Sequence, residues 1–339
     1  MTSHVLDEPP QDDVPSRESL IAKTLELGLV MRRAPQYDIT HPALTLAPLA
    51  IHKSVLYTLY ERQLLWNEAV DRTARQYQLL WDTLRETAES DTTFTGYLLK
   101  ILKLVYLDSS KFQPLMLGIF RTDYMRSVSD KNEKETAEEW KNVEINTISC
   151  SFAGLSPLVN QFHRYLQQYK ALFSNTPTKG LIEGSISGDV IPESLAEAVT
   201  AWKASVPLAD FTASYLKTHP EVSSLTPIVL VVIQEGERNT GDQYKLLFSL
   251  FEKSGVLPLR RTHQQIHEHL TLLDHEAGKA PFMVLEKKYV VALVYYRSAY
   301  VPSDYDVPGV TTFEANPLWQ ARLHMEQSNA VKCPPSHTT

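Results

Sequence analysis

Residues 226–259 read TPIVLVVIQEGERNTGDQYKLLFSLFEKSGVLPL. The apolar run Pro227–Ile233 has the length of a buried strand, and the polar loop Gln234–Asn239 follows it. A helical segment then ends near Ser254-Gly255, and a second short strand spans Val256–Leu259. Because two strands joined through a helix usually pair in parallel, this order predicts a parallel β-α-β unit and an α/β fold.

The chain beyond this unit continues with further helices and strands. A polar helix is predicted over Thr262–Leu273, and a hairpin turning at Glu286-Lys287-Lys288 leads into the apolar strand Tyr289–Tyr296. Asn316-Pro317 combines a preferred N-cap residue with proline at the first helical position. This pair therefore predicts the start of a final helix.

Two more strands and a long helix are predicted in the first half. The strands are Leu115–Phe120 and Val143–Ile148, and the second alternates apolar and polar positions as a strand with two different faces does. Glu144 and Asn146 therefore project to the same side, and their carboxylate and amide oxygens suit Mg²⁺. Apolar residues spaced three and four apart predict one long helix around Trp66–Leu84.

Polar side chains follow the ends of four predicted strands. They are Arg121, Ser149, the pair Glu235 and Glu237, and Arg297. Ligands of open α/β sheets bind beyond the carboxyl ends of the strands, so these positions predict one binding crevice. The residues alone leave alternatives open. An arginine after a strand is often a surface residue paired with a carboxylate, and Glu144 with Asn146 can form a polar sheet face.

Composition argues against several classes of function. The formal net charge is −7, whereas an extended nucleic-acid surface needs a basic excess. No apolar run approaches the roughly 20 residues of a membrane span, and the acidic N-terminus shows no secretory signal. Two distant thiols, Cys150 and Cys333, suit a reducing compartment. We therefore expect a cytoplasmic protein that binds neither nucleic acid nor membrane.

One histidine cluster resembles a metal site. It comprises His263, His267, His269 and His275. The first two have the i,i+4 spacing that places two Zn²⁺ ligands on one helix face. Polar neighbours surround them in the sequence, so we predict an exposed helix without zinc.

Five motifs are spread over most of the chain. They are Phe120–Met125 (FRTDYM), Val143–Ser151 (VEINTISCS), Gln234–Asn239 (QEGERN) with Asp242-Gln243, Tyr296–Tyr300 (YRSAY) and Trp319–Pro334. Together, and in this order, they resemble eukaryotic glutathione synthetase. An unrelated α/β protein would need all five to coincide by chance.

The resemblance implies a fold and a division of the chain. The fold is a permuted ATP-grasp catalytic domain, incomplete here, with an inserted parallel β-α-β substrate-binding domain. The implied segments are a disordered terminus (1–16), the N-terminal part of the ATP-grasp domain (17–190), an insertion or linker (191–225), the substrate-binding domain (226–334) and a non-homologous tail (335–339). Chains of the family continue into a further ATP-binding part, so a C-terminal truncation is also implied.

The resemblance also implies an activity and its residues. The family joins γ-glutamylcysteine to glycine through an acyl phosphate, using ATP and Mg²⁺, and forms homodimers. The implied roles are catalytic for Arg121 and Asp123; substrate-binding for Arg121, Ser149, Ser151, Glu237, Gln243, Arg297 and Tyr300; ATP-binding for Met125 and Glu144; and Mg²⁺-binding for Glu144 and Asn146.

Two functional hypotheses follow. In the first, the chain is a fragment of this ligase and is inactive alone. In the second, it is a non-catalytic variant that dimerises or binds γ-glutamylcysteine.

Overall fold

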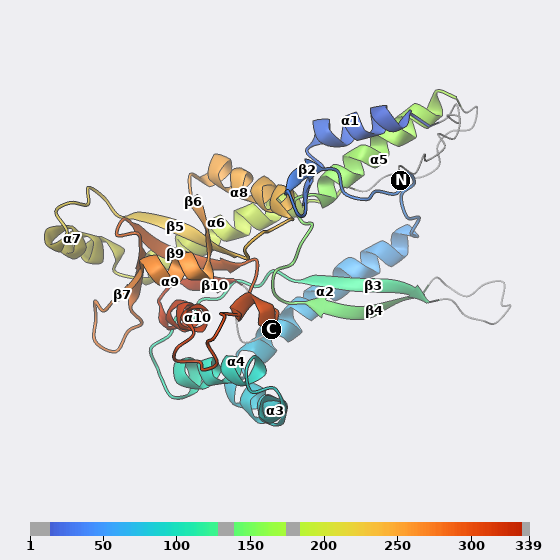
Figure 1. Ribbon diagram of the computed structural model, residues 1–339. Helices are drawn as coiled ribbons and strands as arrows, with labels where there is room; N and C mark the ends of the chain where they lie inside the picture. Colours follow the sequence, from blue (N-terminus) through green and yellow to red (C-terminus); the bar gives the residue numbers. More distant parts are fainter. Residues whose placement is uncertain (1–13, 128–138, 174–183, 334–339) are drawn as a thin grey trace. The chain divides into compact units, whose positions relative to one another are not determined.

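A computed structural model describes residues 14–127, 139–173 and 184–333 (Figure 1). The described chain forms two compact units, each assembled from three stretches. Unit 1 takes its described residues from Met1–Ala50, Ser151–Ile191 and Gly236–Ser249, and unit 2 from Ile51–Cys150, Pro192–Glu235 and Leu250–Thr339. The predicted division into consecutive ranges stays a prediction, and its tail 335–339 lies outside the described residues. No helix among the described residues has the length and apolar character needed to cross a membrane.

Unit 2 is built on a six-stranded mixed sheet (Figure 1). The strand order is β6-β5-β9-β8-β7, and β10 pairs with the end of β9. The pairs β5–β6, β5–β9 and β9–β10 are parallel, whereas β7–β8 and β8–β9 are antiparallel. The strands are β5 (Thr226–Ile233), β6 (Leu257–Thr262), β7 (Leu270–Leu273), β8 (Phe282–Leu285), β9 (Tyr289–Tyr296) and β10 (Val331–Cys333). The predicted parallel β-α-β unit is confirmed, with α8 (Thr240–Ser254) as its helix.

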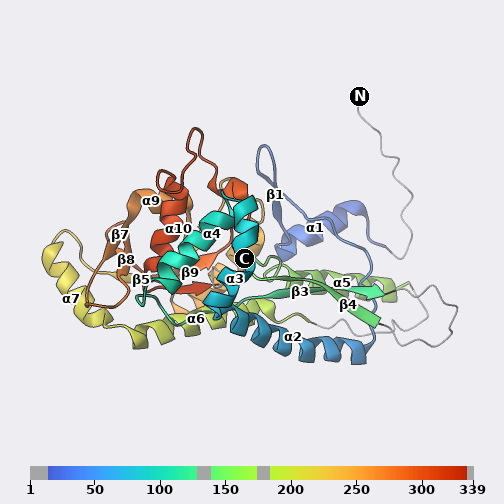
Figure 2. The same ribbon diagram turned by 90° about the horizontal axis from the view of Figure 1, so that it is seen from below.

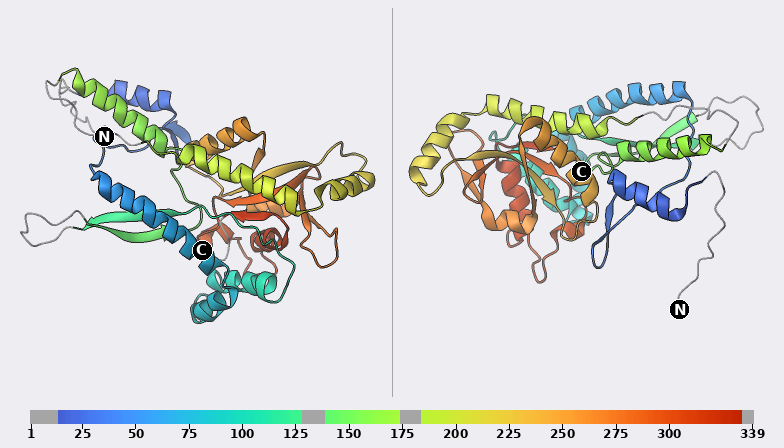
Figure 3. Two further views of the ribbon diagram at one scale, coloured as in Figure 1. Left: turned by 180° about the vertical axis from the view of Figure 1, so that it is seen from behind. Right: turned by 90° about the horizontal axis from the view of Figure 1, so that it is seen from above.

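Helices cover both faces of this sheet because its central strands are apolar on both sides. Leu102, Ile266 and Met325 belong to the core on one face, with α4, α9 and α10 (Figure 2). On the other face lies α6, whose Trp202 ring centroid is 6.2 Å from that of Phe282 (Figures 2 and 3). The helices are α2 (Lys53–Ala74), α3 (Tyr77–Ser90), α4 (Thr95–Leu102), α6 (Ser187–Ser205), α7 (Leu208–Thr218), α9 (His263–His269), α10 (Pro317–Gln327), a π-helical turn (Lys103–Leu107) and a 3₁₀ turn (Pro302–Tyr305).

Unit 1 has a small core of its own. Its elements are α1 (Arg17–Leu27), the antiparallel pair β1 (Met31–Arg33) and β2 (Asp38–Thr40), and α5 (Ser156–Ala171). Leu29, Leu158 and Phe162 are buried between them. The side chain of Ser16 accepts a hydrogen bond from Ser19 N at the start of α1, and Gly28 ends the helix in the left-handed region, at φ 76°.

The two strands predicted in the first half differ in outcome. A strand close to the predicted Val143–Ile148 exists as β4 (Glu139–Asn146), which pairs antiparallel with β3 (Arg121–Ser127). The predicted strand Leu115–Phe120 is wrong, since it has a single bridge, from Met116 to Lys332. In this stretch Ile119 is buried and the other apolar side chains are partly buried, so apolar character here does not require a strand partner.

Three other local predictions are corrected or confirmed. The helix predicted around Trp66–Leu84 is two helices, because the chain leaves the helical region at Gln76 and Tyr77 then packs 4.9 Å from Tyr106. The helix predicted over Thr262–Leu273 ends at His269, where β7 begins. The Asn316 cap and the hairpin before β9 are confirmed.

Candidate functional site

Four predicted site residues come together on the β3–β4 ribbon of unit 2. Arg121 donates from Nε and Nη2 to the two carboxylate oxygens of Asp123, at 2.8 and 2.9 Å. Asn146, which pairs with Arg121 across the ribbon, donates from Nδ2 to Glu144 Oε1 at 2.9 Å and to Asp123 Oδ2 at 3.3 Å. The prediction that Glu144 and Asn146 project to the same side is therefore confirmed. We call these four residues the ribbon cluster.

The ribbon cluster combines two carboxylates with one guanidinium. Hydrogen bonding from Arg121 holds the pKa of Asp123 below its usual value, and the same contact raises the pKa of Arg121. Both groups therefore stay charged at neutral pH. Their side chains are 39% and 36% exposed, so solvent and ligands can reach them.

Oxygen ligands of the ribbon cluster fit Mg²⁺. The carboxylates of Asp123 and Glu144 both lie within hydrogen-bonding distance of the Asn146 amide. Rotation of that amide would turn its oxygen to where its nitrogen now points. Mg²⁺ takes few carboxylates and keeps several waters, so this partial set suits it when water and phosphate oxygens complete the shell. In the described part of the chain, no three His, Cys, Asp or Glu side chains form a metal-binding group.

The turn after β4 is tied to the end of β9, also in unit 2. Ser149 has a left-handed φ of 53°, and its Oγ donates to the Ser298 carbonyl oxygen at 3.3 Å. Arg297 donates from Nη1 to the Cys150 carbonyl oxygen and, at 3.0 Å, to the Tyr295 hydroxyl. Arg297 is 3% exposed, and its hydrogen bond to Cys150 holds this turn in place.

Unit 1 brings together Glu237 and Gln243. Glu237 accepts hydrogen bonds from Asn239 N at 2.7 Å and from Gln243 Nε2 at 2.9 Å, and both side chains are buried. Ser151, the remaining predicted residue of unit 1, opens the segment that leads into α5. Glu237 and Gln243 thus form a satisfied pair at the start of α8.

Asp242 is a residue of this motif to which sequence reasoning gave no role. It is fully buried, and its carboxylate accepts backbone N–H bonds from Phe152 at 3.0 Å, Gly154 at 2.7 Å and Leu155 at 3.2 Å. A Cβ at Gly154 would lie 2.4 Å from the Asp242 carbonyl oxygen, so the close approach needs glycine. Asp242 is the third residue of α8, and the sequence signal for its role was its place beside Gln243 in the first turn of that helix.

Two further predicted site residues lie outside the ribbon cluster, and one member of the cluster stands at a different place in its strand from the one predicted. Met125 is 65% exposed and pairs with Lys141 further along the ribbon, and Tyr300 is 44% exposed. The structure places neither of them in the ribbon cluster. Arg121 opens β3 instead of following a strand, which corrects the prediction, whereas Ser149 and Arg297 do lie beyond the ends of β4 and β9.

The prediction that the histidine stretch forms an exposed helix is wrong at His263. His263 is buried beside Tyr305, with ring centroids 5.1 Å apart, and its Nε2 has no hydrogen-bond partner among the described residues. Its position at the first residue of α9, next to the buried Ile266, turns it toward the core. Burial lowers the pKa of His263 to about 3.

This burial predicts an acid-sensitive stability. The unfolded chain binds a proton at His263 near pH 6.5, and the folded chain does not until about pH 3. The free energy of unfolding should therefore fall as the pH drops below 6.5, relative to His263→Phe, by about 2 kcal/mol at pH 5. Urea unfolding of both proteins at several pH values measures this difference. His267→Gln, at an exposed position of the same helix, is the control, and parallel pH profiles for wild type and His263→Phe would contradict the prediction.

The sequence matches the family model described as "Eukaryotic glutathione synthase, ATP binding domain" over residues 17–288. Curated relatives include the chloroplastic glutathione synthetase of Solanum lycopersicum, 32% identical over 88% of this chain and 47% of that protein. Others are the glutathione synthetases of Dictyostelium discoideum, 30% identical over 91% and 59%, and of Homo sapiens, 28% identical over 93% and 58%. The chain thus spans about half the length of the curated relatives it matches.

A solved structure has the same fold. It is a glutathione synthetase-like effector from Globodera pallida in its apo form, with a TM-score of 0.65 and 15% identity. The similarity covers 98% of this chain and 65% of that one.

Proposed function

This chain belongs to the eukaryotic glutathione synthase family, and we propose that it takes part in the ATP-dependent ligation of γ-glutamylcysteine to glycine. In this reaction the cysteinyl carboxylate is activated as an acyl phosphate, glycine's amine attacks its carbonyl carbon, and phosphate leaves. The protein must orient an anionic dipeptide and neutralise phosphoryl oxygens. Glutathione biosynthesis is the process in which such a chain would act.

The ribbon cluster carries this proposal. A guanidinium that is partly exposed and braced by Asp123 can grip a carboxylate or phosphoryl oxygen in bidentate fashion. Glu144 and Asn146 would hold Mg²⁺, which supplies charge neutralisation at ATP, and Met125 would contact the nucleotide. The two-stranded ribbon would thereby bind the phosphoryl group, the metal ion and the dipeptide carboxylate.

The remaining predicted residues would bind the dipeptide. Ser149 and Ser151 offer hydroxyls to carboxylates, and Tyr300 offers a further one. Glu237 with Gln243 would receive the substrate ammonium. Arg297, buried beneath the Ser149–Cys150 turn, would act on the substrate through the turn that it holds.

The wider architecture belongs to the same proposal. We infer a permuted ATP-grasp catalytic domain that includes residues 17–190, with residues 226–334 as an inserted substrate-binding domain joined to it through 191–225. We also infer a homodimer that works in the cytoplasm.

Replacing Arg121 tests the proposal. Arg121→Ala should weaken γ-glutamylcysteine binding about tenfold or more, because it removes a charged hydrogen-bonding partner of a substrate carboxylate. Isothermal titration of the full chain with γ-glutamylcysteine, and separately with Mg-ATP, measures it. Arg126→Ala, an exposed arginine on the same strand, removes the same charge outside the ribbon cluster and should bind like wild type. Wild-type protein that binds neither ligand would refute the proposed function.

A second candidate is a non-catalytic module that binds γ-glutamylcysteine or dimerises. It follows from the residue roles that the resemblance implies, in which seven residues would bind the dipeptide and two would bind ATP. Glutathione formation from γ-glutamylcysteine, glycine and Mg-ATP discriminates between the two. Dipeptide binding without product would favour the module.

A further inference from the structure

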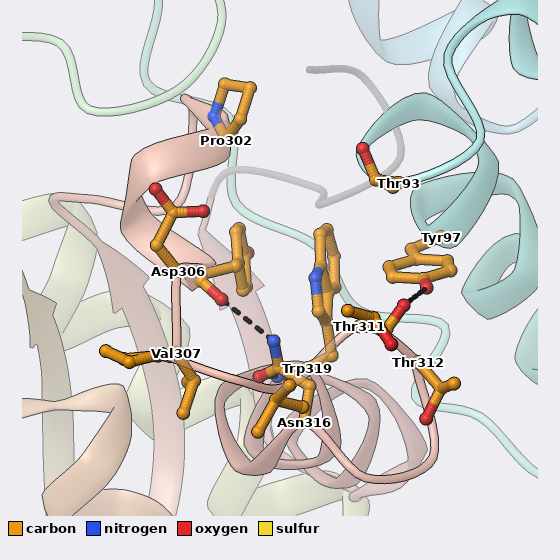
Figure 4. A pocket seen from close by; sticks show the side chains of 12 residues that line it. Thr93, Tyr97, Pro302, Asp306, Val307, Thr311, Thr312, Asn316 and Trp319 are labelled. Atoms are coloured by element: carbon orange, nitrogen blue, oxygen red, sulfur yellow. Dashed lines mark hydrogen bonds between the residues drawn. The ribbon is translucent and has the colours of Figure 1, made fainter.

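A cavity of about 460 Å³ lies in unit 2, apart from every residue given a role above (Figure 4). Three segments line it: the start of α4, the loop from Pro302 to Thr312, and the start of α10. Figure 4 shows Pro302 and Asp306 on one side, Thr93 and Tyr97 on the other, and Trp319 between them. Its volume falls within the range of about 300–1,000 Å³ that is typical of small-molecule sites.

The walls of the cavity are aromatic and rigid. The Tyr305 and Trp319 rings stack at 3.6 Å with an interplanar angle of 6°, and Tyr97 meets Trp319 edge-on at 5.5 Å. Tyr305 and Trp319 are buried, and Phe94 and Phe313 pack against them from outside the cavity. Because Trp319 and Tyr305 are 2% and 3% exposed and stack on each other, the aromatic ring of the lining that a ligand can reach is that of the partly exposed Tyr97. The stack packs against Tyr97, so this ring would lose little freedom on binding.

Several polar groups of the wall are already occupied. The Tyr97 hydroxyl donates to the Thr311 carbonyl oxygen at 3.1 Å. Asn316 donates to the Tyr305 carbonyl oxygen at 2.8 Å and accepts from Leu318 N at 2.9 Å, so it caps α10. These contacts hold the loop against the two helices and leave the Tyr97 ring and one carboxylate for a ligand.

That carboxylate belongs to Asp306, which is exposed to solvent. Among the described residues that line the cavity, Asp306 is the charged one, and none is Lys or Arg. Arg322 lies behind the aromatic wall, where Nη1 donates to the Tyr305 hydroxyl at 3.1 Å, and Glu326 neutralises it at 3.0 Å. The Asn316 side chain accepts from the first free N–H groups of α10, which reduces the pull of this helix end on anions.

We propose that this cavity binds a small organic cation of the alkylammonium class. The face of an aromatic ring such as Tyr97 attracts an ammonium group through its quadrupole, and the Asp306 carboxylate adds direct charge complementarity. The proline and valine side chains of the loop would cover the apolar part of such a molecule. Anionic ligands of this size are disfavoured because none of the described residues that line the cavity is cationic.

Choline is the probe that tests this site in the full chain. We expect titration calorimetry to show choline binding at least about tenfold tighter than its neutral isostere, in which a tert-butyl group replaces the trimethylammonium group. Asp306→Asn should weaken choline binding about tenfold and leave the neutral isostere unchanged. Glu314→Gln, which removes an acid between this loop and α10 and outside the cavity lining, should leave the binding of both compounds unchanged.

The aromatic contribution has its own matched pair. Tyr97→Leu should weaken choline binding, whereas Tyr97→Phe, which keeps the ring, should not. Three results would each overturn the proposal. Wild type could fail to bind choline, or it could bind choline and the neutral isostere equally. It could also prefer an anionic analogue of the isostere, in which a carboxylate replaces the hydroxyl group. Because residues of the ribbon cluster line no part of this cavity, Arg121→Ala should bind choline normally. The two proposals can therefore fail separately.

Discussion

Glu326→Ala is expected to destabilise unit 2 by about 3–5 kcal/mol, because it leaves a buried cation without its partner. Arg322 and Glu326 are both fully buried and lie one helical turn apart on α10, with Nε and Oε1 at 3.0 Å. Glu326 also accepts from the Tyr296 hydroxyl at 2.7 Å and from the Tyr106 hydroxyl at 2.9 Å. Alanine would thus leave one guanidinium and two hydroxyls buried without this hydrogen-bond acceptor, and each lost contact lowers the free energy of unfolding.

Urea unfolding followed by far-UV circular dichroism measures this loss. Glu314→Ala breaks an ion pair with Lys100 that is exposed, and should change stability little. The double variant Arg322→Met with Glu326→Leu should be less destabilised than Glu326→Ala, since it removes the charges together and refills the volume. A Glu326→Ala protein as stable as wild type would show that water reaches Arg322.

Asp242→Ala should destabilise unit 1 by about 3 kcal/mol, because three backbone N–H groups lose their acceptor. Those groups belong to Phe152, Gly154 and Leu155, just before α5, and Asp242 is fully buried at the start of α8. The carboxylate therefore joins two segments that are far apart in the sequence. Its loss should loosen the turn that carries Ser151.

The exchange rates of individual backbone amides measure this local loss of stability. The amides of Gly154 and Leu155 should exchange faster in Asp242→Ala, while amides of β5 and β9 in unit 2 keep their protection. Asp38→Ala, which removes an exposed carboxylate from β2 of the same unit, is the control. Unchanged protection at Gly154 would mean that another acceptor replaces Asp242.

Where local patterns matched the structure, neighbouring residues carried the information. The run Pro227–Ile233 is apolar throughout and became the buried β5, and Asn316-Pro317 caps α10 through contacts two and three residues away. Alternation placed Glu144 and Asn146 on one side of β4, and their hydrogen bond follows. The roles proposed for them in binding Mg²⁺ remain predictions.

Where local patterns misled, a distant partner decided the outcome. Leu115–Phe120 is as apolar as a strand, but among the described residues it makes a single bridge, from Met116 to Lys332, and continuous strand pairing starts only at Arg121. His263 sits in a polar stretch, yet it is buried with its ring beside that of Tyr305, which lies far along the chain. No pattern within α9 records those neighbours.

The sequence by itself determined the family, the α/β class and the β-α-β unit, because motif order, strand hydrophobicity and helix caps are properties of short stretches. Only the tertiary structure decided that Asp242 binds the chain before α5 and that Arg297 is buried behind the Ser149–Cys150 turn. It also decided that aromatic rings from α4 and α10 line a cavity together with the intervening loop. These features depend on side chains that meet across long sequence separations. Their energies come from mutual burial and hydrogen bonding, which no local pattern encodes.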